Sequence, residues 1–146
     1  MYKFKLAPLL RHRKRQEDEK MREMSVINRK MVINTELLHK LTEGRESELD
    51  KFTQASGTAH NVALLRVYQD FLAGRDSDIL HKKMELRQVG ELLEKKRSEL
   101  AEYVKRRRVL EILRDRQEEE YNLEAERREQ KELDDISNQL FLREAW

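Results

Sequence analysis

The stretch that decides the fold is residues 65–110, LRVYQDFLAGRDSDILHKKMELRQVGELLEKKRSELAEYVKRRRVL. Apolar side chains recur in it at alternating steps of three and four residues, over more than six heptads. The stripe runs through Leu65, Tyr68, Leu72, Arg75, Ile79, Lys82, Leu86, Val89, Leu93, Lys96, Leu100, Tyr103, Arg107 and Leu110. Ten of these fourteen are apolar or aromatic, which is typical of the a and d positions of a coiled coil.

A second, weaker stripe precedes the first. It runs through Met24, Ile27, Met31, Asn34, Leu38, Leu41, Arg45, Glu48, Phe52 and Ala55. Between the stripes, Gly57 suits a helix C-cap and Thr58 can N-cap the next helix. We therefore predict one coiled-coil domain over residues 1–146. Its first helix covers about residues 8–56 and begins at Pro8, its turn about 56–59, and its second helix about 59–142.

A turn near residue 57 folds the two stripes together in antiparallel fashion. Facing residues then have numbers that add up to about 116 or 117, so that apolar layers meet apolar layers. Asn34 is expected to meet Lys82 in a polar layer that can fix the register. The expected core consists of Met24, Ile27, Met31, Leu38, Phe52, Leu65, Leu72, Ile79, Leu86, Val89, Leu93 and Leu100.

The second predicted helix is much longer than the first, on the order of 125 Å at 1.5 Å per residue. The first helix should start opposite about residues 103–107. Everything beyond, including EEEYNLEAERREQKELDDI at residues 118–136, is predicted to lack an intramolecular partner. The expected fold class is thus all-α: a long two-helix antiparallel coiled-coil hairpin with a C-terminal helical overhang that serves as a docking element.

The composition excludes several classes of protein. Of the 146 residues 41% are charged and 38% hydrophobic, which is too polar for a compact multi-layer core. The lack of cysteine excludes disulfides and thiolate metal sites. No apolar run approaches the roughly 18 residues of a membrane span, and residues 6–10 are too short for a signal-peptide core. We therefore expect a cytoplasmic protein without direct membrane insertion.

Catalytic chemistry is not expected either. A two-helix hairpin has no enclosed pocket that could desolvate a reacting group. The four histidines, His12, His39, His60 and His81, are not spaced as i,i+4 metal-ligand pairs, and no glycine-rich phosphate loop is present. The sequence therefore predicts no enzyme activity, no metal site and no cofactor.

Two further features leave alternatives open. The basic clusters RHRKR (residues 11–15) and KRRR (105–108) should meet at the open end of the hairpin. This positive end could be solvated, bind an acidic protein or bind a nucleic acid. No interleaved aromatics support the last of these. Four apolar residues near the turn lie off the stripe: Val62, Leu64, Val67 and Phe71. We expect them to be buried against the hairpin, and a partner-binding patch is the alternative.

Several motifs resemble those of one known family. The N-terminal motifs are Phe4-x-Leu6 and Leu9-Leu10-x-x-Arg13, and the C-terminal ones are Val109-Leu110-Glu111, Glu120-Tyr121-x-x-Glu124 and EQKELDDI at residues 129–136. Together with the length and architecture they resemble the FliJ family of flagellar type III export proteins over the whole chain. The YscO-type proteins of injectisomes are the nearest alternative.

The resemblance implies a non-catalytic stalk of the flagellar export apparatus. Family members sit in the hexameric ring of the export ATPase, promote its assembly, touch the export gate protein of the membrane and handle export chaperones. It implies a place in the cytoplasm, peripherally at the inner membrane of the flagellar base. A general escort for flagellar subunits or their chaperones is the alternative function, and a nucleic-acid-binding coiled coil is a weaker one.

Residues are transferred from the family only where its motifs match. The contacts implied with the ATPase ring are Phe4, Leu6, Leu10, Arg13, Tyr121, Glu124, Glu129, Leu133 and Ile136. The contacts implied with the export gate are Leu41, Tyr68 and Phe71. Gly44 and Glu48 stand where the family has aromatic residues on the first helix, so the chain departs from the family pattern on the gate surface.

Overall fold

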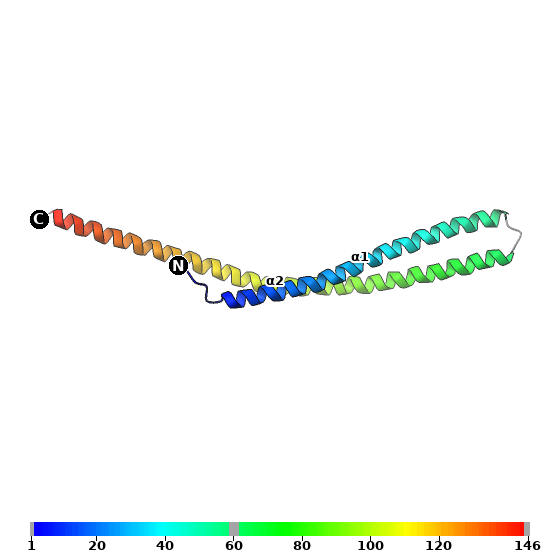
Figure 1. The fold of residues 1–146 in the computed structure, drawn as a ribbon, viewed down its shortest axis with the longest axis horizontal. Helices are drawn as coiled ribbons and strands as arrows, with labels where there is room; N and C mark the ends of the chain where they lie inside the picture. Colours follow the sequence, from blue (N-terminus) through cyan, green and yellow to red (C-terminus); the bar gives the residue numbers. More distant parts are fainter. Residues whose placement is uncertain (1, 59–61, 145–146) are drawn as a thin grey trace. The chain divides into compact units, whose positions relative to one another are not determined.

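The computed structural model describes residues 2–58 and 62–144, and in these two ranges it contains helices and no strand. Helix α1 spans Ala7–Thr58 and helix α2 spans Val62–Glu144. The two helices pack against each other, which confirms the predicted all-α helical hairpin (Figure 1). Such long helices form because the single proline, Pro8, lies in the first turn of α1, where its missing N–H is not needed.

The end of α1 differs from the prediction. Gly57 and Thr58 belong to α1, and no described glycine has a positive φ. Gly57 is therefore not a left-handed C-cap, and α1 continues to Thr58. The interior φ/ψ of a helix is open to glycine at about 1 kcal/mol relative to alanine, so Gly57 alone did not force a stop. Residue 59, the last of the predicted turn, lies outside the described residues.

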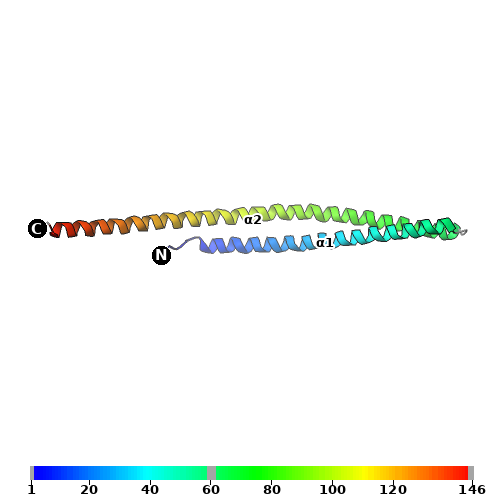
Figure 2. The same cartoon turned by 90° about the horizontal axis from the view of Figure 1, so that it is seen from above.

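The chain divides into two compact units, Glu19–Leu100 and the combination of Met1–Asp18 with Ala101–Trp146. In the unit Glu19–Leu100, α1 and α2 run side by side (Figures 1 and 2). Glu23 bonds to Lys96 and Arg45 to Asp76, so residue numbers fall along one helix as they rise along the other. The helices of this unit are therefore antiparallel.

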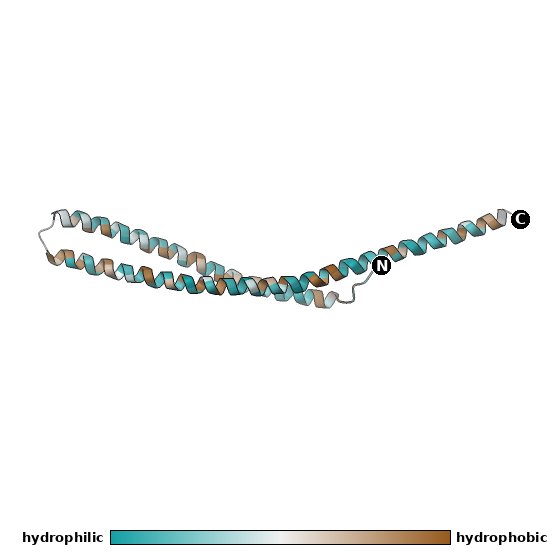
Figure 3. Cartoon of the chain, turned by 180° about the vertical axis from the view of Figure 1, so that it is seen from behind, coloured by the Kyte–Doolittle hydropathy of each residue, from teal (hydrophilic) through white to brown (hydrophobic). Residues whose placement is uncertain are grey.

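Both stripes of this unit point inward. Every stripe position from Met24 to Ala55 and from Leu65 to Leu100 is buried or half-buried. Only Leu72, Ile79 and Leu93 fall below a tenth exposed, because two helices alone cannot enclose a side chain from all sides. Hydrophobic and hydrophilic residues accordingly alternate along both helices (Figure 3).

Contacts between the helices differ slightly in register from the predicted ones. The Phe52 and Tyr68 rings lie 6.1 Å apart, and Asn34 donates to Glu85 over 3.4 Å. The numbers of these pairs add up to 119 or 120. The difference arises because each helical side chain leans toward the N-terminus of its own helix, so contacting residues lie further along both chains. Asn34 therefore meets Glu85, which Lys82 also contacts at 2.6 Å, and the polar layer has three members.

The core of the other unit is one leucine and an ion-pair network. Leu10 is 6% exposed. Beside it along the helices, Arg107 pairs with Glu17 across the hairpin and with Glu111 on its own helix, and Lys14 lies 3.6 Å from Glu111. The hydrogen bond from Arg107 holds the pKa of Glu111 below its ordinary range, and Lys14 acts in the same direction.

Candidate functional site

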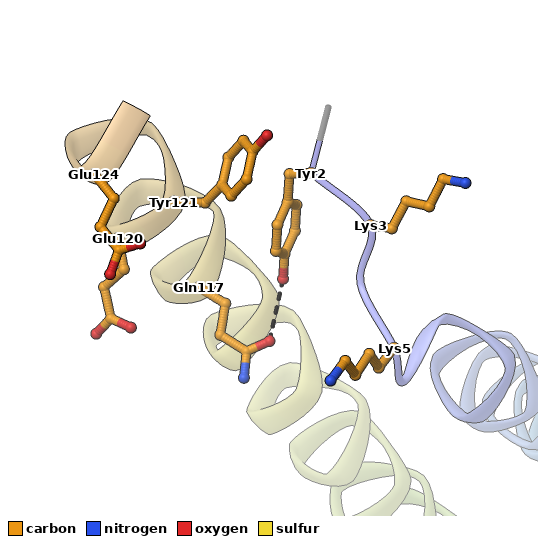
Figure 4. A pocket seen from close by; sticks show the side chains of 7 residues that line it. All are labelled: Tyr2, Lys3, Lys5, Gln117, Glu120, Tyr121 and Glu124. Atoms are coloured by element: carbon orange, nitrogen blue, oxygen red, sulfur yellow. Dashed lines mark hydrogen bonds between the residues drawn. The ribbon is translucent and has the colours of Figure 1, made fainter. Parts of the chain in front are cut away.

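The residues before α1 form a strap, defined here as residues 2–6, that lies on α2. The Ala7 amide donates to the Phe4 carbonyl over 3.2 Å, which sets the strap's direction at the start of α1. The Tyr2 hydroxyl donates to Oε1 of Gln117 over 3.1 Å, and the Tyr2 ring lies 5.8 Å from that of Tyr121 at 44° (Figure 4). Partial burial raises the pKa of Tyr2, followed by the charge of Glu118, so its hydroxyl stays protonated and able to donate.

The strap corrects the predicted extent of the overhang. We expected no intramolecular partner beyond about residues 103–107, yet Gln117 and Tyr121 both contact Tyr2. The prediction ended the pairing at the start of the first helix, whereas the residues before α1 continue it: the numbers of Tyr2 and Gln117 add up to 119, as those of Asn34 and Glu85 do. A few non-helical residues therefore reach well past the start of α1. Gln117 and Tyr121 continue the steps of three and four beyond Leu110, but the stripe is weak there because Arg114 and Gln117 are polar.

The strap is held weakly. A hydrogen bond of this kind contributes about 0.5–1.5 kcal/mol, and an aromatic pair about 0.5–1.5 kcal/mol. Ordering the backbone costs about 1–2 kcal/mol for each residue of the strap. The hydrogen bond is also solvent-exposed. The two contacts together contribute less than the ordering cost of the five residues, so the strap is held only loosely.

Beyond the strap, α2 is without cover. From Asn122 to Leu142 every side chain is exposed except Ala125, which is half-buried. This segment, residues 122–144, is the overhang. Ion pairs along it join neighbouring turns, such as Glu124 with Arg128 at 3.4 Å. Its exposed apolar side chains are Leu123, Leu133, Ile136, Leu140, Phe141 and Leu142, and the hydrophobic end of α2 is visible in Figure 3.

The residues expected to contact an ATPase ring fall into three environments. Leu10 is in the core, so its side chain stabilises the hairpin and is not presented outward. Phe4 and Arg13 are half-buried, and Arg13 donates to Gln16 over 3.0 Å. The exposed members are Leu6, Tyr121, Glu124, Glu129, Leu133 and Ile136.

A second surface lies near the start of α2. Leu64, Val67, Tyr68 and Phe71 line a shallow, mostly apolar groove with Glu48 of α1. The expected burial of Val62, Leu64, Val67 and Phe71 was wrong, since all four are exposed. They lie off the inward stripe, and the described residues include no third element that covers them.

The predicted gate residues only partly share this groove. Tyr68 and Phe71 line it, whereas Leu41 is half-buried elsewhere on α1. The Arg75 guanidinium lies 5.0 Å from the centre of the Phe71 ring, a cation–π contact. At Gly44 nothing lies within 4 Å of where a Cβ would be, so this position leaves open space on α1.

The basic clusters are partly neutralised within their own unit. Arg107 and Lys14 face carboxylates, and Lys105 donates to Glu102 over 2.9 Å. Arg11 and Arg15 are exposed and line a shallow hollow with Pro8 and His12. The positive charge that remains available is therefore smaller than the sequence suggested.

The described ranges offer no candidate for two other kinds of site. In residues 2–58 and 62–144, no three side chains of the metal-ligating types gather closely enough to hold an ion. Neither helix, over the residues described, has a window long and apolar enough to cross a bilayer.

Comparison with known proteins identifies the family. The family model described as "Flagellar FliJ protein" matches residues 2–145. A search of curated proteins and a search of solved structures each found no match. The match to the family model includes the strap, both helices and the whole overhang. The chain therefore belongs to the FliJ family and is a component of the flagellar protein export apparatus.

Proposed function

We propose that the chain is a non-catalytic stalk that promotes assembly and activity of the hexameric export ATPase and links it to the export gate. Membership of the FliJ family supports a role in flagellar export, and the surfaces of the hairpin support this particular role. The protein acts in the cytoplasm, held peripherally at the inner membrane through its partners.

The observation that carries the proposal is the uncovered overhang. A helix with Leu133, Ile136 and Leu140 more than half exposed has apolar surface without an intramolecular partner. Helices of this kind gain most of their stability from packing, so the overhang is expected to pack against another protein. Its many charges limit the apolar contact, which suits a shaft that has to turn or shift inside a ring.

The groove near the start of α2 is the proposed gate contact. Phe71 and Tyr68 supply aromatic surface there, and Val67 and Leu64 extend it. Gly44 and Glu48 supply no aromatic surface from α1, so we propose that α2 carries most of this contact.

Truncation tests the ATPase contact. A chain that ends after Ala125 keeps the strap contacts and all residues that are buried or half-buried where burial is described, up to Leu142, so it should unfold with the same cooperativity as the full chain. We expect it to lose at least tenfold in stimulation of the ATPase, corresponding to about 1.4 kcal/mol. Stimulation is measured as phosphate release by the purified export ATPase at increasing chain concentration. Undiminished stimulation by the truncated chain would exclude the overhang as the ring contact.

A general escort for export chaperones is the second candidate. The exposed apolar groove at Leu64, Val67 and Phe71 favours it, because such a groove suits an amphipathic helix of a small chaperone. Phe71→Ala should then weaken chaperone binding in a calorimetric titration without the ATPase, while the distant Leu80→Ala should not. If Phe71→Ala leaves chaperone binding unchanged but weakens gate binding, the escort function is not located at this groove.

A further inference from the structure

Tyr121 is covered by a segment of the same chain. The Tyr2 ring lies beside that of Tyr121, and the Tyr2 hydroxyl binds Gln117 one helical turn earlier (Figure 4). Because the overhang begins directly after Tyr121, the strap closes over the boundary between the paired and the uncovered parts of α2. A protein that surrounds the overhang and advances toward the hairpin meets the strap first.

The strap also has features of a movable element. Its two contacts with α2 offset only part of its ordering cost, so an open form is expected to be populated beside the closed one. A shallow hollow between the strap and α2 is lined by Lys3 and Lys5 together with Glu120 and Glu124, yet neither lysine lies within ion-pair distance of a carboxylate in the described residues. Glu120 pairs instead with Arg116, and Glu124 with Arg128.

We propose that the strap is an autoinhibitory cover: in its closed form it occupies the Tyr121 face of α2, and docking of the ATPase ring displaces it. Opening uncovers the side of the Tyr121 ring that faces Tyr2 and frees the half-buried Phe4 for contact, while Leu6 and Gln117 are exposed already. This inference rests on the proposed function, since it concerns the regulation of the same docking surface. The free chain is then held in a weaker-binding form until a ring is present.

The coupling predicts the direction of a mutational effect. If only the open fraction binds, the apparent affinity is reduced by that fraction, so a variant that cannot close should bind more tightly. Tyr2→Ala removes both the ring contact and the hydrogen bond, and we expect about a two- to tenfold lower Kd for the ATPase. Tyr2→Phe keeps the ring and loses only the hydroxyl, so its Kd should fall between those of the wild type and Tyr2→Ala.

A cross-link that holds the strap closed tests the opposite effect on binding. The chain has no cysteine, so Lys5→Cys with Gln117→Cys introduces the only two thiols. Both positions line the hollow, and Lys5 is directed toward α2 in Figure 4. A cleavable bis-maleimide should lock the strap closed and raise the Kd at least tenfold, and cleavage of the linker should restore it. The same double variant without linker is the matched control.

Binding is measured by calorimetric titration of the export ATPase, and strap opening separately by hydrogen exchange of the Ala7 amide, which donates to the Phe4 carbonyl, in the free chain. Faster exchange in Tyr2→Ala together with tighter binding supports the proposal. Faster exchange with unchanged or weaker binding overturns it, and so does unaffected binding by the locked chain. If wild type, Tyr2→Ala and locked chain all fail to bind, the proposed function itself has failed.

Discussion

Ile79 and Leu80 are neighbours in the chain with opposite environments, 8% and 62% exposed. Ile79→Ala removes buried methyl groups that the hairpin cannot refill, and we expect about 2–3 kcal/mol lower free energy of unfolding, near the low end for buried sites because the core is thin. Leu80→Ala is the matched control and should change it by less than about 0.5 kcal/mol. Urea titration followed by circular dichroism measures both. Equal losses would mean that the stripe does not face the partner helix.

Carboxylates of ion pairs within α2 and between the two helices link stability to pH. Hydrogen bonds from Lys96 and then Lys20 lower the pKa of Glu23, Lys82 lowers that of Glu85, and Arg107 that of Glu111. A lowered folded-state pKa adds stability above the ordinary value of 4.5, and this stability is lost as the pH falls through the folded-state value. The midpoint of urea unfolding should therefore be level from pH 7 to 5 and decline below about pH 4.5.

The exposed position of these pairs limits the size of the decline and makes it sensitive to salt. Arg107→Gln should flatten the acid dependence, because Glu111 then loses the donor that most lowers its pKa. Arg108→Gln, at an exposed neighbouring position, should leave the dependence as it is. A decline that is the same in Arg107→Gln would assign it to other carboxylates.

At the scale of the helices, two interior glycines weaken otherwise regular elements. Gly44 and Gly74 are exposed and helical, and nothing lies within 4 Å of a Cβ added at either. Gly44→Ala and Gly74→Ala should each raise the free energy of unfolding by about 0.5–1 kcal/mol, because alanine loses less backbone entropy. Gly57→Ala, in the last turn of α1, should have a smaller effect since helix ends fray. A loss of stability at Gly44 or Gly74 would show that the glycine avoids a contact.

The helices were predictable because their signals are repetitive. Both stripes recur over many turns, so one polar interruption such as Arg75 did not hide the inward face. Single features were not predictable. Gly57 continues α1, because glycine can either continue or end a helix. Phe71 is exposed, and a periodic pattern does not tell whether another element is available to cover such a residue. The strap contacts of Tyr2 were not predicted because the stripe fades after Leu110: Gln117 and Tyr121 continue its steps, but of these two only Tyr121 is aromatic.

At the scale of the whole molecule, the hairpin leaves much apolar surface outside its core. Within the described residues, only Leu10, Leu72, Ile79 and Leu93 form the buried core, whereas exposed apolar side chains occur on both helices. A protein built in this way gains little from folding alone and has surface to offer to partners. This balance agrees with a component of a larger export machine.

Site-specific photo-cross-linking tests the docking of the overhang most directly. A benzophenone amino acid is placed at Leu133 or Ile136 of the overhang, or at the exposed Leu80 as the control, and each chain is irradiated with the purified export ATPase. If the overhang docks in the ATPase ring, we expect cross-links to the ATPase from Leu133 and Ile136 and none from Leu80. Cross-links from Leu80 alone, or equally from all three positions, would contradict it.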